Sequence, residues 1–284
     1  MLYMSDLKTL FSSIFTRIAS SMRSQFETSS QYTPINMASE IINNYYDPVP
    51  YVERTIQTYT NSTITSIGSG AFRCCSTLST ISLPNVTTIS EYAFYQCSGL
   101  TSIDLPNAIY IANQAFEACE ALSTINIPNV TNIQSWAFQG CCLITLSLPN
   151  LYYTGSAFAF CSSLTTVNLP NITSIDAMTF YHCSLLSSVS LPNVTTIGDE
   201  AFRCCSTLST ISLPKLSYIG NRAFCECTSL ASLYLLGSSV CSIASIDAFA
   251  ITPMETTGRI YVPASLYDTY KTTYAIVSHI FVSV

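Results

Sequence analysis

The chain has 284 residues, of which 49% are hydrophobic and only 9% are charged, and its formal net charge is −6 at pH 7. This apolar content excludes a disordered chain, which combines low hydrophobicity with high charge. We expect no nucleic-acid partner, because phosphate contacts need clustered cations. We also expect no membrane span, because no apolar run approaches the roughly 18 residues that cross a bilayer.

Residues 1–60 are predicted to form a helical segment that caps or attaches the rest of the chain. Apolar residues recur there at three- and four-residue spacing, which indicates an amphipathic helix with one buried stripe. The stripe consists of Leu7, Leu10, Phe11, Ile14, Ile18 and Met22. Asn36 can cap a second short helix, and residues 47–50 then break the helix and lead into an extended stretch, Tyr51 to Thr60.

The first 25 residues lack the basic start, apolar core and small-residue cleavage site of a secretory peptide. We therefore expect the N-terminal helix to pack on the chain or to dock to a larger assembly. A helix lying on a membrane surface is the alternative, which three cations and a Ser-rich polar face favour only weakly.

One unit of about 22 residues recurs along the chain. Its proline column has steps of 22, 22, 21, 21, 22 and 22 residues and comprises Pro84, Pro106, Pro128, Pro149, Pro170, Pro192 and Pro214. Its phenylalanine column comprises Phe72, Phe94, Phe116, Phe138, Phe158, Phe180, Phe202 and Phe224. The stretch Ala71–Pro84 recurs unchanged as Ala201–Pro214, which indicates duplication of whole units.

Each unit is expected to form one coil of a solenoid. Between Leu78 and Pro84, apolar residues alternate with Ser and Thr, the period of a strand with one dry face, and the proline ends that strand because it lacks a donor. Ala93, Phe94 and Cys97 then fall within about one helical turn and are expected to face inward. One unit cannot offset the entropy of ordering its own residues, so the units must stack and share a core.

The predicted fold class is α/β: a repeat solenoid with a stacked parallel β-sheet, short helical turns on the opposite side, a helical N-terminal segment and a small α/β C-terminal cap. The solenoid is expected at residues 61–258 as about eight to nine repeats, with the cap at residues 259–284. Three elements are predicted in the cap: a strand Ile260–Val262, a helix from about Ser265 to Tyr274, and a strand near Ile280–Val284.

Most of the thirteen cysteines follow the same period rather than the spacing of a bridge or a metal site. Eight form one column, at Cys75, Cys97, Cys119, Cys141, Cys161, Cys183, Cys205 and Cys227. We interpret this column as buried thiols that act as small hydrophobic side chains. The five cysteines off the column are expected to be easier to reach, and they are Cys74, Cys142, Cys204, Cys225 and Cys241.

No constellation in the sequence supports a reaction, so we expect no enzyme and no catalytic, cofactor or metal site. There is no phosphate loop, no HExxH motif, no GxSxG elbow and no recurring carboxylate pair. His182 adjoins Cys183, but the thiol belongs to the inward column and the imidazole is therefore expected to point outward. The five Asn-x-Ser/Thr matches, of which four are the repeated turn after proline, are interpreted as turn residues rather than glycosylation sites.

Exposed aromatic side chains give the candidate partner contacts. The outward strand positions are mostly Ser and Thr, whereas interface energy concentrates in Trp, Tyr and Arg. The candidates are Trp136, Tyr152, Tyr153, Tyr110, Tyr218 and Tyr92, of which the first three are the strongest. The alternative is that these aromatic residues only fill half-buried edges of the solenoid.

The unit at residues 186–205, LSSVSLPNVTTIGDEAFRCC, resembles the BspA-like class of leucine-rich repeats through its LP-x-V-x-x-I turn and its AF-x-x-C close. The resemblance covers residues 61–250, and residues 260–270 are similar to the C-terminal cap of such chains. It implies a leucine-rich-repeat solenoid and a surface protein that adheres to host matrix proteins, other cells or glycans. Residues 5–44 are more loosely similar to a helical module of phage or prophage tail-associated proteins.

The leading functional prediction is therefore a non-catalytic adhesion protein whose extended repeat surface contacts a host protein, a matrix component or a glycan. This prediction implies a cell-surface or extracellular location. The alternative prediction is a phage or prophage tail-associated protein for receptor recognition or structure, located in the virion or prophage particle.

Overall fold

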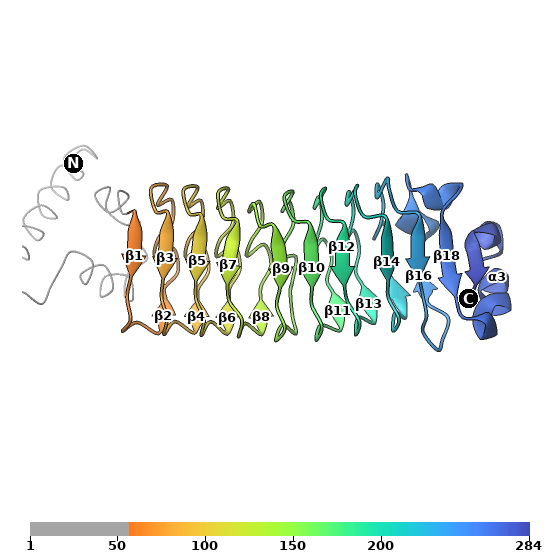
Figure 1. Cartoon of the computed structure of the whole chain (residues 1–284), viewed down its shortest axis with the longest axis horizontal. Helices are drawn as coiled ribbons and strands as arrows, with labels where there is room; N and C mark the ends of the chain where they lie inside the picture. The colour runs from red at the N-terminus through yellow and green to blue at the C-terminus, as the bar shows by residue number, and fades with distance from the viewer. Residues whose placement is uncertain (1–56) are drawn as a thin grey trace, which may run out of the picture. The chain divides into compact units, whose positions relative to one another are not determined.

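The structure is a computed structural model that describes residues 57–284, all of which belong to one compact unit. Figure 1 shows the coils of this unit following one another along a single axis, from β1 to the C-terminal elements. The predicted amphipathic stripe from Leu7 to Met22 and the predicted cap at Asn36 lie outside the described residues.

One strand of each coil contributes to a column of parallel strands. The strands of this column are β1 (Thr58–Thr60), β3 (Thr80–Ser82), β5 (Ser102–Asp104), β7 (Thr124–Asn126), β9 (Thr145–Ser147), β10 (Thr166–Asn168), β12 (Ser188–Ser190), β14 (Thr210–Ser212) and β16 (Ser232–Tyr234). Their pairing is in register, so that Ile81 lies between Tyr59 and Ile103. Hydrogen-bonded pairing is interrupted between β7 and β9 and between β12 and β14, which divides the column into three sheets. The predicted stacked parallel strands are confirmed.

A second column of two-residue strands runs along the other side of the turn that contains the proline. It consists of β2 (Ser66–Ile67), β4 (Thr88–Ile89), β6 (Tyr110–Ile111), β8 (Asn132–Ile133), β11 (Ser174–Ile175), β13 (Thr196–Ile197), β15 (Tyr218–Ile219) and β17 (Ser242–Ile243). One coil contributes no strand here, and only a single parallel bridge joins Asn132 to Tyr153.

The core is a set of columns that run the length of the solenoid. Every phenylalanine from Phe72 to Phe224 in the repeat column is at most 4% exposed, and Phe249 extends the column by one position. Successive rings are stacked, with centroids 4.9 Å apart at Phe94 and Phe116. The cysteine column is buried as predicted, and each of its last seven thiols donates to the carbonyl of a phenylalanine in a preceding coil, as Cys119 does to Phe94 at 3.1 Å. These thiols are therefore hydrogen-bond donors as well as small apolar groups.

The predicted short helical turns are not confirmed in the described solenoid. Each regular coil contains instead a three-residue turn between two residues in the left-handed region, as at Tyr92 (φ 57°) and Gln96 (φ 57°). Left-handed residues interrupt a right-handed helix. They also leave alternate amides free for the next coil, and Phe94 N–H donates to the Ala115 carbonyl at 2.7 Å. Hydrogen bonds between coils thus alternate with bonds inside the coil, such as that from the Tyr95 N–H to the Tyr92 carbonyl at 3.1 Å.

One coil, residues 143–164, departs from this pattern. Its second side is shortened, and Thr154 stands in the position that Ile133 and Ile175 occupy in the neighbouring coils. Thr179 of the next coil stands where the repeat has alanine, and its hydroxyl lies 2.7 Å from the Gly155 carbonyl and 3.4 Å from the Thr154 hydroxyl. The two threonines, both 0% exposed, therefore satisfy the polar groups that the shortened coil turns inward.

The C-terminal elements close the other end of the stack. They are η2 (Ile246–Phe249), η3 (Pro253–Glu255), β18 (Arg259–Val262), η4 (Ala264–Leu266), α3 (Tyr267–Thr273), η5 (Ala275–Ile280) and β19 (Phe281–Ser283). β18 pairs with β16, and β19 pairs with β18, both in parallel. The Cys241 amide donates to the Tyr270 hydroxyl at 2.8 Å, and the Ile243 amide donates to the Tyr274 hydroxyl at 2.9 Å. Side-chain hydroxyls thus take the place of a further coil.

The placement of these elements agrees with the strand, helix and strand predicted after residue 258. β1 lies before residue 61, where the first repeat was expected, and it already pairs with β3. The division of the chain into residues 1–60, 61–258 and 259–284 stays a prediction.

Candidate binding surface

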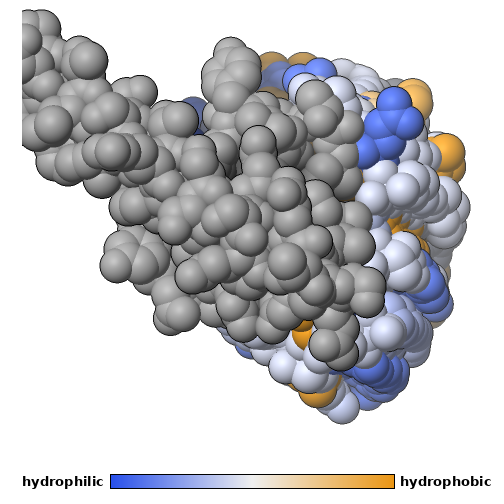
Figure 2. All heavy atoms as spheres, turned by 90° about the vertical axis from the view of Figure 1, so that its left-hand side faces the viewer, coloured by the Kyte–Doolittle hydropathy of each residue, from blue (hydrophilic) through white to orange (hydrophobic). Residues whose placement is uncertain are grey.

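One row of hydroxyl groups beside the main sheet is used within the protein. In five units the residue after the first leucine is Ser or Thr and donates to the preceding coil, as Thr101 does to the Ser79 carbonyl at 3.0 Å and Ser187 to the Thr165 carbonyl at 3.4 Å. Figure 2 shows a surface that is mostly pale, with separate orange and blue areas where it is not covered by grey atoms. The outward strand positions of the main sheet are mostly Ser and Thr, so the face of this sheet offers few of the Trp, Tyr and Arg side chains that anchor partners.

The repeated asparagine after the proline also forms a ladder. Its side-chain amide donates to the carbonyl of the proline in the preceding coil, as Asn129 does to Pro106 at 2.9 Å and Asn193 to Pro170 at 2.7 Å. Lys215 occupies the corresponding position in a later coil and donates to the Asn193 side-chain oxygen at 2.6 Å. The amide nitrogen that glycosylation would modify is thus already engaged at these turns.

The strongest candidate contacts are exposed. Tyr152 is 64% exposed, Trp136 45% and Tyr153 40%. Tyr153 is bridged to Asn132, and the Trp136 amide donates to the Ser156 carbonyl, so the three residues lie on two adjacent coils. The structure therefore brings them to neighbouring coils and leaves their side chains open to solvent.

The other three candidates differ in their surroundings. Tyr110 belongs to the same row as Tyr153, because Asn132 pairs with both, and Tyr218 lies further along the second strand column. Tyr92 is only half-buried, and the Arg73 guanidinium lies over its ring at 5.7 Å. Four further exposed apolar residues lie in this part of the chain outside the six candidates, and they are Ile109, Ile144, Phe160 and Met178. Ile109 and Ile144 depart from a Ser- or Thr-rich consensus, which was the available signal, whereas the positions of Phe160 and Met178 vary from coil to coil.

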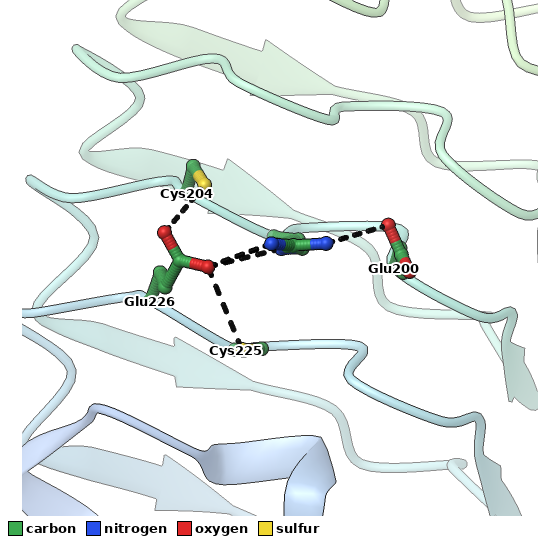
Figure 3. Close-up of polar contacts among 5 residues, drawn as sticks. Glu200, Cys204, Cys225 and Glu226 are labelled. Carbon is green, nitrogen blue, oxygen red and sulfur yellow. Dashed lines mark hydrogen bonds and ion pairs between the residues drawn. The ribbon is translucent and has the colours of Figure 1, made fainter.

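A cluster of charged residues lies on the turn side of two later coils (Figure 3). Arg203 is paired with Glu200 at 3.2 Å and with Glu226 at 2.8 Å. The Arg203 guanidinium donates to the Glu226 carboxylate and holds the pKa of that carboxyl below its usual value. Cys204 lies 3.3 Å from the other carboxylate oxygen. Burial, followed by the hydrogen bond to Glu226, raises the pKa of Cys204 to about 11.

The prediction that off-column cysteines are easier to reach is only partly right. Cys74 and Cys142 are partly exposed, whereas Cys204, Cys225 and Cys241 are buried. Cys204 and Cys225 lie against the Arg203–Glu226 pair, which belongs to two neighbouring coils, and Cys241 lies beneath Tyr270. Burial raises the pKa of Cys241 to about 12, so these three thiols resist ionisation.

His182 is not a partner of the thiol beside it. Its ring stacks on Phe160, with centroids 5.2 Å apart, while Cys183 is fully buried and donates to the Phe158 carbonyl. Among residues 57–284, no three His, Cys, Asp or Glu side chains are grouped so that they could hold a metal ion. No helix in that part of the chain is long and apolar enough to cross a membrane.

A shallow apolar hollow of about 280 Å³ separates the last coil from the C-terminal elements. It is lined mainly by apolar side chains, among them Ile246, Phe249 and Val277, together with Tyr274. The Tyr274 hydroxyl is already bonded to the backbone of the last coil. The hollow therefore presents an apolar surface without a set of reactive groups.

Two comparisons with known proteins find matches. A family model described as the BspA type leucine-rich repeat region matches residues 53–156 and 153–275, with six copies of its repeat. No curated protein matches the chain. Among solved structures, a leucine-rich cell surface protein of Faecalibacterium prausnitzii is 23% identical, with 74% of each chain covered and a TM-score of 0.42.

Two further solved structures are similar to this chain. The leucine-rich repeat protein of T. pallidum is 23% identical over 58% of this chain and 87% of its own, with a TM-score of 0.49. A leucine-rich repeat protein of Bacteroides ovatus is 19% identical over 80% of this chain and 92% of its own, with a TM-score of 0.32.

Proposed function

Because the chain belongs to the BspA-type leucine-rich repeat family, we propose that it is a non-catalytic binding protein that contacts its partner through the outer surface of its coils. A cell-surface or extracellular location accords with this role. The alternative of a tail-associated phage protein depends on residues 5–44, which lie outside the described residues.

The distribution of exposed apolar side chains carries this proposal. Eight of the fourteen large exposed hydrophobic residues of the described chain lie between Ile109 and Met178. Apolar side chains that are exposed together mark interaction sites more often than singly scattered ones do. Trp136, Tyr152 and Tyr153 are the proposed centre of the contact, because tryptophan and tyrosine dominate binding energy at interfaces. Tyr92, Tyr110 and Tyr218 are proposed as peripheral contacts.

The test is a variant that carries Trp136→Ala, Tyr152→Ala and Tyr153→Ala together. We expect its affinity for a ligand identified on glycan and matrix-protein arrays to fall at least about 30-fold, the effect of losing one to two binding hot spots. Its urea midpoint should change little, because all three side chains are exposed. Ile251→Ala, which removes a side chain that is 59% exposed at the far end of the solenoid, is the matched control. An unchanged affinity in the triple variant would rule out this contact.

A further inference from the structure

The middle of the solenoid carries no charge. Residues 121–175 contain no Asp, Glu, Lys, Arg or His, although the chain as a whole holds 26 charged residues. Glu120 and Asp176 border this stretch, which we call the uncharged belt. The belt also holds five of the exposed large hydrophobic residues, which are Trp136, Ile144, Tyr152, Tyr153 and Phe160. Aromatic exposure and absence of charge thus coincide.

The register of the second strand column creates a trough at one edge of the belt. Thr131 and Asn132 lie on the coil between Ile109–Tyr110 and Tyr152–Tyr153. Two strand spacings separate the outer coils, or about 9.6 Å. Thr131 and Asn132 are partly buried and form the floor, while the larger side chains on both sides are exposed.

The dimensions of the trough decide between kinds of ligand. An α-helix with its side chains is about 10–12 Å across, which is wider than the separation of the two flanking coils. An extended peptide normally adds to a free strand edge, but the strand pairing here already runs from Tyr110 through Asn132 to Tyr153. A flat chain of sugar rings is narrower than a helix and does not need an unpaired strand edge, so it can lie in this trough.

The polar groups of the trough are neutral. The Asn132 side-chain oxygen accepts from the Gln134 amide, and within residues 57–284 the Asn132 side-chain N–H groups donate to no protein atom. In the same described part of the chain, the hydroxyls of Tyr110, Tyr152 and Tyr153 have no protein partner. Tyrosine presents an apolar ring with a polar tip, which matches the C–H face and the hydroxyl edge of a pyranose.

Charge also distinguishes among glycans. An anionic polysaccharide would meet no cation in the belt and a chain of net charge −6, whereas a cationic ligand would find no carboxylate there. We infer that the uncharged belt binds a neutral polysaccharide. Its sugar rings would pack against Tyr152 and Tyr153, and the sugar hydroxyls would accept hydrogen bonds from the Asn132 side-chain N–H groups. This inference rests on the proposed function and names the chemical class of its ligand.

The experiment measures binding of the full chain to soluble neutral polymers (β-1,3-glucan, mannan and dextran) and to two anionic ones (heparin and hyaluronan), at 50 and 500 mM NaCl. We expect binding to at least one neutral polymer, with a Kd that changes less than about 2-fold between the two salt concentrations, because no ions are released. Tyr152→Ala should weaken that binding at least about 10-fold, and Tyr152→Phe, which keeps the ring, less than about 3-fold.

Leu185→Ala is the matched control, since it removes a side chain that is 51% exposed and lies outside the belt. Binding confined to the anionic polymers, or equal binding by Tyr152→Ala and the unmodified chain, would overturn the inference. A matrix protein that binds through Trp136, Tyr152 and Tyr153, with no binding of any neutral polymer, would refute the glycan and leave the proposed function standing. If no ligand of any class binds in a way that depends on these three residues, both the glycan inference and the proposed function are contradicted.

Discussion

The identical stretches Ala71–Pro84 and Ala201–Pro214 lie in different coils and compare one sequence in two settings. Their inner sides are alike: Phe72 and Phe202 are both buried, and so are the column cysteines that follow them. The left-handed residue also recurs, with φ 60° at Cys74 and 62° at Cys204. The repeat sequence by itself thus determines the backbone and the core.

The outer sides of the two stretches differ. Arg73 lies over the rings of Tyr92 and Tyr95, at 5.7 and 5.0 Å. Arg203 lies over the Tyr181 ring at 5.7 Å and in addition pairs with Glu200 and Glu226. A surface side chain in a stacked solenoid meets residues of the coils before and after it. The surface chemistry of a coil is therefore set by its neighbours, and binding sites are expected where neighbouring coils depart from the repeat together.

Two phenylalanines of one coil, one in the core and one at the surface, should show the largest difference in their contribution to stability. Phe158 is fully buried between Phe138 and Phe180, while Phe160 is 45% exposed. Phe158→Ala should lower the free energy of unfolding by about 3–5 kcal/mol through the cavity it leaves. Phe160→Ala should lower it by about 1 kcal/mol or less. Urea unfolding measures both, and equal losses would contradict the assignment of the inner column.

Adjacent cysteines give a smaller effect of the same kind. The Cys205 thiol donates to the buried Phe180 carbonyl at 3.3 Å, and Cys205→Ala should cost about 1–2 kcal/mol in lost packing and hydrogen bonding. Cys204→Ala removes a thiol at the surface of the core and should cost about 0.5 kcal/mol. The informative quantity is the difference in unfolding free energy between the two variants. A difference near zero would show that the cysteine column does not stabilise the core more than its neighbours do.

The two arginine variants are expected to have the smallest effects on stability. Of the two residues, only Arg203 forms ion pairs within the described part of the chain. Arg203→Ala should cost about 0.5–1 kcal/mol in low salt and less in high salt, as for other exposed ion pairs. Arg73→Ala should cost about 0.5 kcal/mol, as expected of an exposed cation over an aromatic ring. Because the pKa of Glu226 is lowered from 4.5, its contribution is present above about pH 4.5 and is lost as the pH falls further.

Urea unfolding of the unmodified chain and of both arginine variants, at pH 7 and below pH 4.5, measures this difference. Arg203→Ala should remove the larger part of the acid dependence that comes from Glu226, because Arg203 is the main cause of the lowered pKa and the Cys204 hydrogen bond a smaller one, and Arg73→Ala should preserve it. An identical pH dependence in the two variants would show that Glu226 gains nothing from its arginine.

The columns of the core could be predicted from the sequence because they depend only on the period of the repeat. The turn conformation could not, since Ala93, Phe94 and Cys97 have a spacing that suits a helical turn equally well. The left-handed positions carry Trp136, Met178 and other residues rather than a regular glycine, so the usual signal for positive φ is absent.

The exposure of surface residues could be predicted only where it depends on a single coil. Tyr152 and Tyr153 protrude from their own coil, and their exposure agrees with the prediction. The Cys204 thiol lies against Glu226, which belongs to the following coil. The prediction for this thiol failed because it considered each unit without its neighbours.

The most direct test of the account is the rate at which each thiol of the native chain reacts with a small alkylating agent, followed by mass spectrometry of its peptides. Cys74 is partly exposed and Cys204 is buried against Glu226, although the same residues surround both in sequence. Cys74 should react at least about 10-fold faster than Cys204, whose thiol is shielded and has a raised pKa. Equal rates at Cys74 and Cys204 would contradict the claim that neighbouring coils determine the surface.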